Sequence, residues 1–201
     1  MWPFLFFSFI RYYRQRLLKA LNKDLAEEME WIQDMVIEHP KSYQIWRHRQ
    51  VVVEYLSEQF LSTPPPVPTT PTSATAPTPT IQYQDLPSNQ QEKIQEMVEV
   101  ELKCLKEALE NDSKNYHAWS YRQWVMTHFG PGPWWEEELS FVNGLMEVDI
   151  RNNSAWNQRF FAITEGPKGL TEEVLQVEVE YTKAKIQRTP NNESPWVYLS
   201  G

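Results

Sequence analysis

Two short segments of the chain gather the side chains best suited to bind an anion. Just before Trp46 stand Lys41, Tyr43 and Gln44. Just before Trp119 stand Lys114, Asn115, Tyr116 and His117. If both segments open helices that lie side by side, these groups converge with unsatisfied helix N–H groups and form an anion site at one rim. The alternative interpretation is that exposed helix starts are often polar without any further role.

The elements that must position these side chains repeat along the chain. Four segments align on a tryptophan, at residues 40–50, 113–123, 150–160 and 190–199. The aligned tryptophans are Trp46, Trp119, Trp156 and Trp196, so their separations are 119 − 46 = 73, 156 − 119 = 37 and 196 − 156 = 40 residues. Removing an insertion at 62–89 shortens the first separation to 73 − 28 = 45 residues. A period in the upper thirties is typical of a solenoid of stacked helical hairpins.

An arginine follows the tryptophan three positions later in the first three repeats, at Arg49, Arg122 and Arg159. A vestige of the motif lies 46 − 11 = 35 residues before Trp46, with Arg11 in the tryptophan position and Arg14 in the arginine position. We expect each tryptophan to be a core wedge between hairpins, because an indole buries a large area. Each arginine should bind carbonyls or acids of the next hairpin. These positions are therefore predicted to be structural.

Apolar spacing predicts a first helix in each repeat, at 24–38, 91–110, 134–148 and 171–188. The second helices should open at N-cap residues, namely Ser42, Asn115, Asn152 or Asn153, and Asn192. No stretch outside the insertion alternates with a period of two, so strands are not expected. The predicted fold class is all-α, a superhelical solenoid of stacked antiparallel hairpins that resembles tetratricopeptide arrays.

A single helical-repeat domain is predicted over residues 11–201, interrupted at 62–89. Thr63–Thr80 contains seven prolines and seven threonines in eighteen residues, which is typical of a disordered loop and less so of a proline-recognition ligand. Residues 1–10 are almost entirely apolar and precede RYYRQR, the reverse of a secretory signal. We expect a helix start or an unnatural gene-model start there, with a membrane-surface anchor as the alternative. The expected location is cytoplasmic.

Composition excludes several function classes. The chain has 201 residues and a net charge of 19 − 27 = −8, which does not favour nucleic-acid binding. One cysteine, Cys104, and four scattered histidines do not supply a metal site, so no metal is expected in this chain. No apolar run is long enough for stable membrane insertion.

The strings PKSYQIWRHRQ, DSKNYHAWSYRQWV and DIRNNSAWNQRFF, followed by NNESPWVYL, resemble the repeats of protein prenyltransferase α subunits. The likeness is greatest to the α subunit shared by protein farnesyltransferase and geranylgeranyltransferase type I. It covers about residues 13–199 without the insertion. It implies a crescent of helical hairpins around a β subunit, in an enzyme that transfers a farnesyl or geranylgeranyl group to the cysteine of a C-terminal CaaX motif.

The resemblance also implies roles for individual residues. Lys41 matches the lysine that reaches the diphosphate of the isoprenoid donor, and Tyr43 and His117 match neighbours of that diphosphate. Asn115 and Tyr116 accompany them, while Gln44 matches the glutamine that binds the carboxylate of the CaaX peptide. Lys41, Tyr43 and His117 are therefore the expected catalytic residues.

The implied partners are a prenyltransferase β subunit, an isoprenoid diphosphate and CaaX-containing proteins such as small GTPases. Zinc is expected in the β subunit and magnesium with the diphosphate. Family α subunits are longer at both ends, so the resemblance implies a truncated chain. The alternative function is a non-catalytic tetratricopeptide-like scaffold, which would have no need to keep Lys41, Tyr43, Gln44 and His117 together.

Overall fold

The computed structural model describes residues 13–21, 25–61 and 81–200 of the chain. Residues 13–21 are helical and precede four helical hairpins. The hairpins are α2 (Ala26–Glu38) with α3 (Tyr43–Leu61), α4 (Ser88–Asn111) with α5 (Tyr116–His128), α6 (Trp134–Val148) with α7 (Asn153–Thr164), and α8 (Glu172–Arg188) with α9 (Glu193–Ser200). A short 3₁₀ helix, η1 (Tyr83–Asp85), precedes α4. No strand occurs within these ranges, which confirms the all-α prediction.

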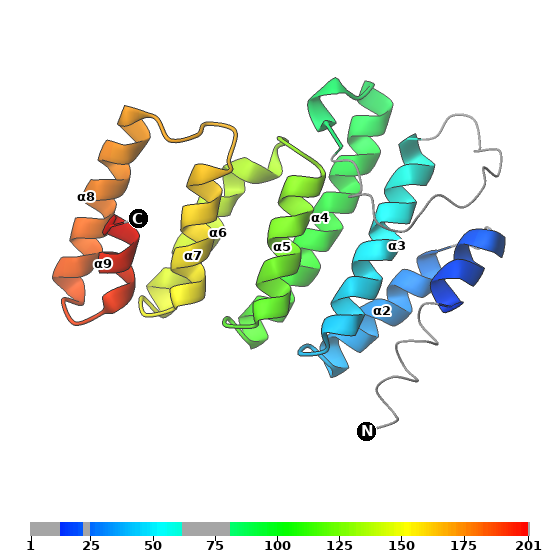
Figure 1. Cartoon of the computed structure of the whole chain (residues 1–201), viewed down its shortest axis with the longest axis horizontal. Coiled ribbons are helices and arrows are strands. Elements are labelled where there is room, and N and C mark those ends of the chain that lie inside the picture. Colours follow the sequence, from blue (N-terminus) through cyan, green and yellow to red (C-terminus); the bar gives the residue numbers. More distant parts are fainter. Residues whose placement is uncertain (1–12, 22–24, 62–80, 201) are drawn as a thin grey trace.

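The hairpins stack side by side into a right-to-left row in Figure 1, in the order of the sequence. Their four tight turns lie along one edge of the row, the lower edge in that view, so α3, α5, α7 and α9 all begin there. The second helices of neighbouring hairpins also contact one another: α3 contacts α5, α5 contacts α7, and α7 contacts α9. This arrangement brings equivalent helix starts next to each other, as the repeat predicted.

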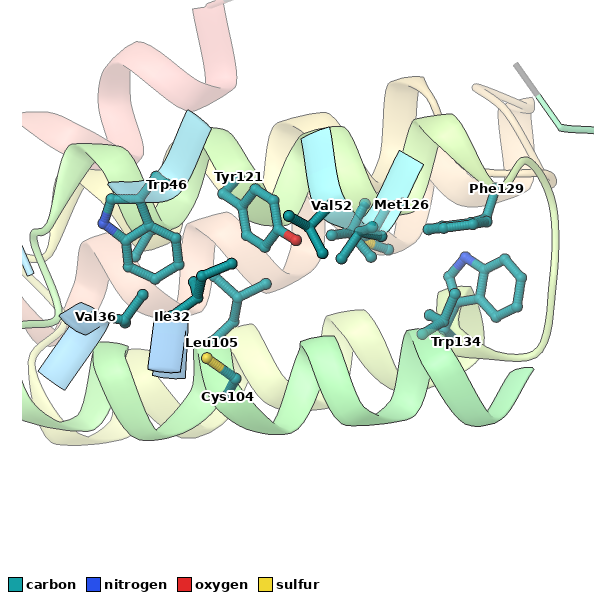
Figure 2. Close-up of a cluster of buried hydrophobic side chains, with 14 of the residues drawn as sticks. Ile32, Val36, Trp46, Val52, Cys104, Leu105, Tyr121, Met126, Phe129 and Trp134 are labelled. Atoms are coloured by element: carbon teal, nitrogen blue, oxygen red, sulfur yellow. The ribbon is translucent and has the colours of Figure 1, made fainter. Parts of the chain in front are cut away.

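Besides a small cluster of Val142, Met146, Ala155 and Trp156 in the third hairpin, a larger core of buried side chains runs between the helices of the first two hairpins and reaches Trp134 and Trp135. Figure 2 shows Trp46 beside Tyr121 at one end of this core and Phe129 near Trp134 at the other. The rings of Trp46 and Tyr121 lie 5.5 Å apart, and Trp119 approaches Phe141 of the next hairpin at 6.1 Å. Trp156 contacts Tyr181 and Tyr198 of the fourth hairpin. Because each of the first three repeat tryptophans contacts an aromatic residue of the following hairpin, the predicted wedge role is confirmed for these three.

Buried arginine–glutamate pairs connect successive hairpins. Each arginine of the motif binds a glutamate on the first helix of the next hairpin: Arg49 with Glu101, Arg122 with Glu138, and Arg159 with Glu178. Arg14 binds Glu28 in the same way. The glutamates also accept a hydrogen bond from the residue two positions after the repeat tryptophan in their own hairpin, namely His48, Tyr121, Gln158 and Tyr198. These contacts confirm the structural prediction for the arginines.

The insertion differs in part from its prediction. Residues 62–80 lie outside the described residues, but 81–89 are ordered and α4 begins at Ser88, earlier than expected. The Ile81 N–H donates to the His128 carbonyl at 2.7 Å, and the ring of Tyr83 meets Trp134 at 5.0 Å. Gly130 allows this approach, because its φ is +69° and a Cβ there would lie 2.7 Å from the Ile81 carbonyl oxygen. Local spacing alone does not reveal such a tertiary contact.

Cys104 is buried in α4, which confirms its assignment as a small packed residue. Burial raises the pKa of its thiol, so the thiol stays protonated at neutral pH. Within the described ranges, no helix is both long and apolar enough to cross a bilayer.

Candidate functional site

A ladder of asparagine side chains joins the starts of the second helices. Asn115 and Asn152 cap α5 and α7 through their Oδ1 atoms, which accept backbone N–H groups of the first turn. Each also donates from Nδ2 to a carbonyl in the turn of the preceding hairpin, Asn115 to Pro40 at 2.9 Å and Asn152 to Ser113 at 3.0 Å. Asn192, directly before α9, makes the equivalent bond: its Nδ2 donates to the Ile150 carbonyl at 3.0 Å. The helix starts are thereby fixed at a defined separation.

The accepting carbonyl also binds the tryptophan of its own hairpin. Trp46 Nε1 donates to the Pro40 carbonyl at 2.8 Å, and Trp119 Nε1 donates to the Ser113 carbonyl at 3.0 Å. One carbonyl oxygen therefore anchors both the core wedge of its hairpin and the next helix start. Lys41 follows Pro40 directly, so the hydrogen bond from Asn115 joins the two segments that carry the predicted site residues.

Lys41 lies at this rim with its side chain 80% exposed. Its Nζ atom lies 3.5 Å from Oδ2 of Asp112, which belongs to the turn of the second hairpin. An exposed ion pair of this kind contributes little free energy, about 0–1 kcal/mol. The ammonium can therefore exchange Asp112 for a more highly charged anion at small cost.

The other predicted site residues share this rim. Tyr43 and Tyr116 occupy equivalent positions at the starts of α3 and α5, and both are mostly exposed. His117 is half-buried beside Tyr116, with their rings 5.6 Å apart. The Gln44 side chain is also half-buried, and its Oε1 atom accepts a hydrogen bond from the Ser42 hydroxyl at 3.0 Å. The phenol and imidazole groups can thus approach an anion bound between the two helix starts.

Asn115 differs from its neighbours because it is only 3% exposed. Its Oδ1 accepts the N–H groups of His117 and Ala118, and its Nδ2 donates to Pro40. Both polar atoms are therefore already bonded within the protein. Ser42, which was expected to cap α3, has the equivalent position before that helix, but its hydroxyl donates to Gln44.

The sequence analysis did not identify the glutamates that pair with the arginines, namely Glu28, Glu101, Glu138 and Glu178. Their separations are 101 − 28 = 73, 138 − 101 = 37 and 178 − 138 = 40 residues, and the repeat tryptophans have the same separations. This shared spacing is a signal that could have found them. Among the described residues, no group of three or more His, Cys, Asp or Glu side chains is arranged to hold a metal ion.

Comparison with known proteins matches this geometry to one family. The model of the protein prenyltransferase alpha subunit repeat matches residues 25–56, 98–129 and 135–165. These segments coincide with the α2–α3, α4–α5 and α6–α7 hairpins. The matched unit is therefore the hairpin that carries the repeat tryptophan and the arginine three residues after it.

Curated relatives include protein farnesyltransferase/geranylgeranyltransferase type-1 alpha subunits. The chain is 46% identical to the Dictyostelium discoideum protein over 68 residues, which cover 33% of this chain and 21% of that protein. It is 48% identical to the Arabidopsis thaliana protein over 66 residues, covering 32% and 20%. The human geranylgeranyl transferase type-2 alpha subunit is 34% identical over 106 residues, covering 49% of this chain and 18% of the relative.

A solved structure extends the likeness to nearly the whole chain. The Candida albicans protein geranylgeranyltransferase-I complexed with GGPP superposes with a TM-score of 0.73 and 30% identity. The superposition covers 96% of this chain but 53% of that chain, so the present chain spans about half the length of its structural relative. The repeats, the relatives and the superposition agree: residues 25–56, 98–129 and 135–165 are protein prenyltransferase alpha subunit repeats, and the chain is similar to alpha subunits of that family.

Proposed function

We propose that this chain is the α subunit, or part of the α subunit, of a heterodimeric protein prenyltransferase. The enzyme would transfer a farnesyl or geranylgeranyl group from its diphosphate to the cysteine of a C-terminal CaaX motif. Its substrates would be CaaX-containing proteins such as small GTPases. The chain would act only together with a β subunit.

The observation that carries this proposal is the hydrogen bond from Asn115 to the Pro40 carbonyl, 75 residues earlier in the chain. It ties the segment with Lys41, Tyr43 and Gln44 to the segment with Tyr116 and His117. A scaffold that only binds peptides has no need for a cation, phenols and an imidazole at one pair of helix starts. The named relatives and the Candida albicans complex support the same function.

The proposed chemistry of this rim is stabilisation of the leaving group. Negative charge builds on the diphosphate as its bond to the isoprenoid breaks. The Lys41 ammonium would move from Asp112 to a diphosphate oxygen, and the Tyr43 hydroxyl and His117 imidazole would donate further hydrogen bonds. Such donors accelerate the reaction because they bind the transition state more strongly than the ground state.

Gln44 would have a different role at the same rim. Its amide Nε2 is a donor that can bind the terminal carboxylate of a CaaX peptide, while its Oε1 is held by Ser42. A carboxylate far from the reacting atoms binds ground and transition states alike. Gln44 would therefore set peptide affinity and not the rate of the chemical step.

Metal ions enter this proposal through other molecules. The described residues form no metal-binding cluster, so they do not fit the zinc ion that the family implies. We place zinc in the β subunit, and magnesium with the diphosphate.

The test is co-expression of this chain with a farnesyltransferase β subunit and an assay of transfer to a CaaX peptide. Lys41→Ala should lower kcat on the order of 100-fold, by analogy with loss of one oxyanion donor. Gln44→Ala should mainly raise the KM for the peptide. The matched control is Arg151→Ala, which removes an exposed cation from the equivalent position of the third repeat.

Circular dichroism and co-purification with the β subunit should show that each variant folds and assembles. A well-assembled Lys41→Ala heterodimer with normal turnover would remove this residue from the reaction and favour the peptide-binding scaffold. Absence of transfer by the assembled wild-type heterodimer, with either donor, would contradict the function as a whole.

A further inference from the structure

We infer that Asn115 is a positioning residue for the diphosphate site, and that it acts by holding His117 at a fixed place relative to Lys41. This inference rests on the proposed function. It gives Asn115 a role that differs from direct diphosphate binding.

The geometry of Asn115 supports a role through other residues. Its Oδ1 accepts the His117 N–H at 3.0 Å, while its Nδ2 donates to the carbonyl of Pro40 at 2.9 Å. Pro40 is bonded to Lys41, so one side chain links the backbones of both site residues. With 3% of its surface exposed, Asn115 has little access to a ligand.

The chemistry of the amide explains why this position needs asparagine. Capping requires an acceptor close to the backbone, and the link to Pro40 requires a donor on the same short side chain. Serine supplies the cap, but its shorter side chain does not extend to both partners.

The ladder itself offers a matched control. Asn152 makes the same three hydrogen bonds, two to the N–H groups of α7 and one to the Ser113 carbonyl, and it is equally buried. Its link joins the α7 start to the Ser113 carbonyl in the turn before α5, so it leaves in place the Asn115 bonds that connect Lys41 with His117, and α7 itself carries none of the proposed site residues. Loss of either asparagine should therefore cost similar stability, and only loss of Asn115 should disturb the site.

The expected effect follows from how steeply catalysis depends on position. A displacement of about 1 Å in a catalytic group costs on the order of 100-fold in rate. Removing the link to Pro40 frees the Lys41 turn and the α5 start to shift relative to each other. We therefore expect Asn115→Ser to lower kcat about 10- to 100-fold, with the peptide KM nearly unchanged, since Gln44 stays on α3.

The experiment compares Asn115→Ser with Asn152→Ser in heterodimers with the β subunit. Melting temperature, kcat, peptide KM and affinity for a fluorescent isoprenoid diphosphate are measured for both. Similar falls in melting temperature, with a loss of kcat and of diphosphate affinity confined to Asn115→Ser, would support the inference. Equal kcat values in the two variants would overturn it.

A second pair, Asn115→Thr and Asn152→Thr, keeps a capping hydroxyl and fills more of the space. If both Asn115 variants fail to assemble while both Asn152 variants assemble, Asn115 serves folding and the inference is wrong. The Lys41→Ala heterodimer separates the two hypotheses. If Lys41→Ala lowers kcat while the Asn115 variants keep the wild-type kcat, only the positioning role is wrong. If Lys41→Ala itself keeps the wild-type kcat, the proposed diphosphate site is wrong.

Discussion

The buried arginines differ in how completely each guanidinium is hydrogen-bonded. Nη1 of Arg49 donates to Gln33 at 3.0 Å, and Nη1 of Arg159 donates to Asn143 at 2.8 Å. Both acceptors lie five residues after a pair-forming glutamate, at 28 + 5 = 33 and 138 + 5 = 143. The same position of α4 holds Lys106, because 101 + 5 = 106, and a lysine offers no acceptor.

Arg122 shows the consequence. Its Nη1 atom is buried without a hydrogen-bond partner, although its other nitrogens bind Glu138. A buried unsatisfied donor costs about 1–3 kcal/mol. The pairing scheme is thus complete in the first and third hairpins and incomplete in the second.

Replacing Lys106 with glutamine should therefore stabilise the protein. Lys106→Gln supplies an amide oxygen at the position that Gln33 and Asn143 occupy, and we expect a gain of about 1 kcal/mol in the free energy of unfolding. Urea denaturation at pH 7 measures this gain. Lys103→Gln, an exposed change on the same helix, is the control and should have little effect. Equal stability of the two variants would show that Nη1 is satisfied in another way.

At the scale of elements, the end of α5 is covered by the segment that leads into α4. The His128 carbonyl accepts the Ile81 N–H, and its imidazole stacks on Trp124 at 4.6 Å. Burial lowers the pKa of His128 to about 4, below its ordinary value of 6.5. The position of His128 at the C-terminus of α5 would favour the protonated imidazole, but the effect of burial is larger and lowers the pKa.

This burial predicts that stability falls in mildly acidic solution. Below pH 6.5 the unfolded chain binds a proton at His128 that the folded chain does not bind, so stability decreases as pH falls from 6.5 towards 4. The loss should amount to about 1–3 kcal/mol. His128→Phe keeps the stack on Trp124 and should remove this part of the pH dependence. Urea denaturation between pH 7.5 and 4.5 tests it; identical profiles would assign the acid sensitivity to other groups.

At the scale of the whole molecule, each hairpin gains stability from its neighbours. Trp156 is 1% exposed, because the α8–α9 hairpin covers it, with Tyr198 at 5.2 Å between ring centres. Trp196 has the same place in its own hairpin and is 49% exposed. The same residue type at the same repeat position thus has two environments, decided by whether a described hairpin follows it.

The two tryptophans should therefore differ in their contribution to stability. Trp156→Ala should cost about 3–5 kcal/mol, because it removes a fully buried indole and leaves a cavity between hairpins. Trp196→Ala should cost about 1 kcal/mol or less, as is usual for exposed positions. Urea denaturation of the 201-residue chain measures both. Similar losses would mean that Trp196 is buried in solution.

Much of the fold was contained in the sequence. The repeat spacing predicted the hairpins, the N-cap asparagines marked where α5, α7 and α9 begin, and Trp46, Trp119 and Trp156 were correctly expected in the core. Local signals suffice for these features because helix periodicity and capping depend on residues within a few positions of each other. Local signals did not predict the ordered segment at 81–89, because its structure depends on contacts with His128 and Trp134, which are distant in the sequence.

The candidate site, too, was predicted in part from the sequence and in part revealed only by the structure. The sequence alone identified Lys41, Tyr43, Gln44, Tyr116 and His117 as polar groups at two helix starts. Only the tertiary structure revealed that both polar atoms of the Asn115 side chain form hydrogen bonds with backbone groups, and that Nδ2 binds the Pro40 carbonyl. A bond between residues 75 positions apart depends on how two hairpins stack, and stacking is decided by packing across the whole solenoid, which no local pattern contains.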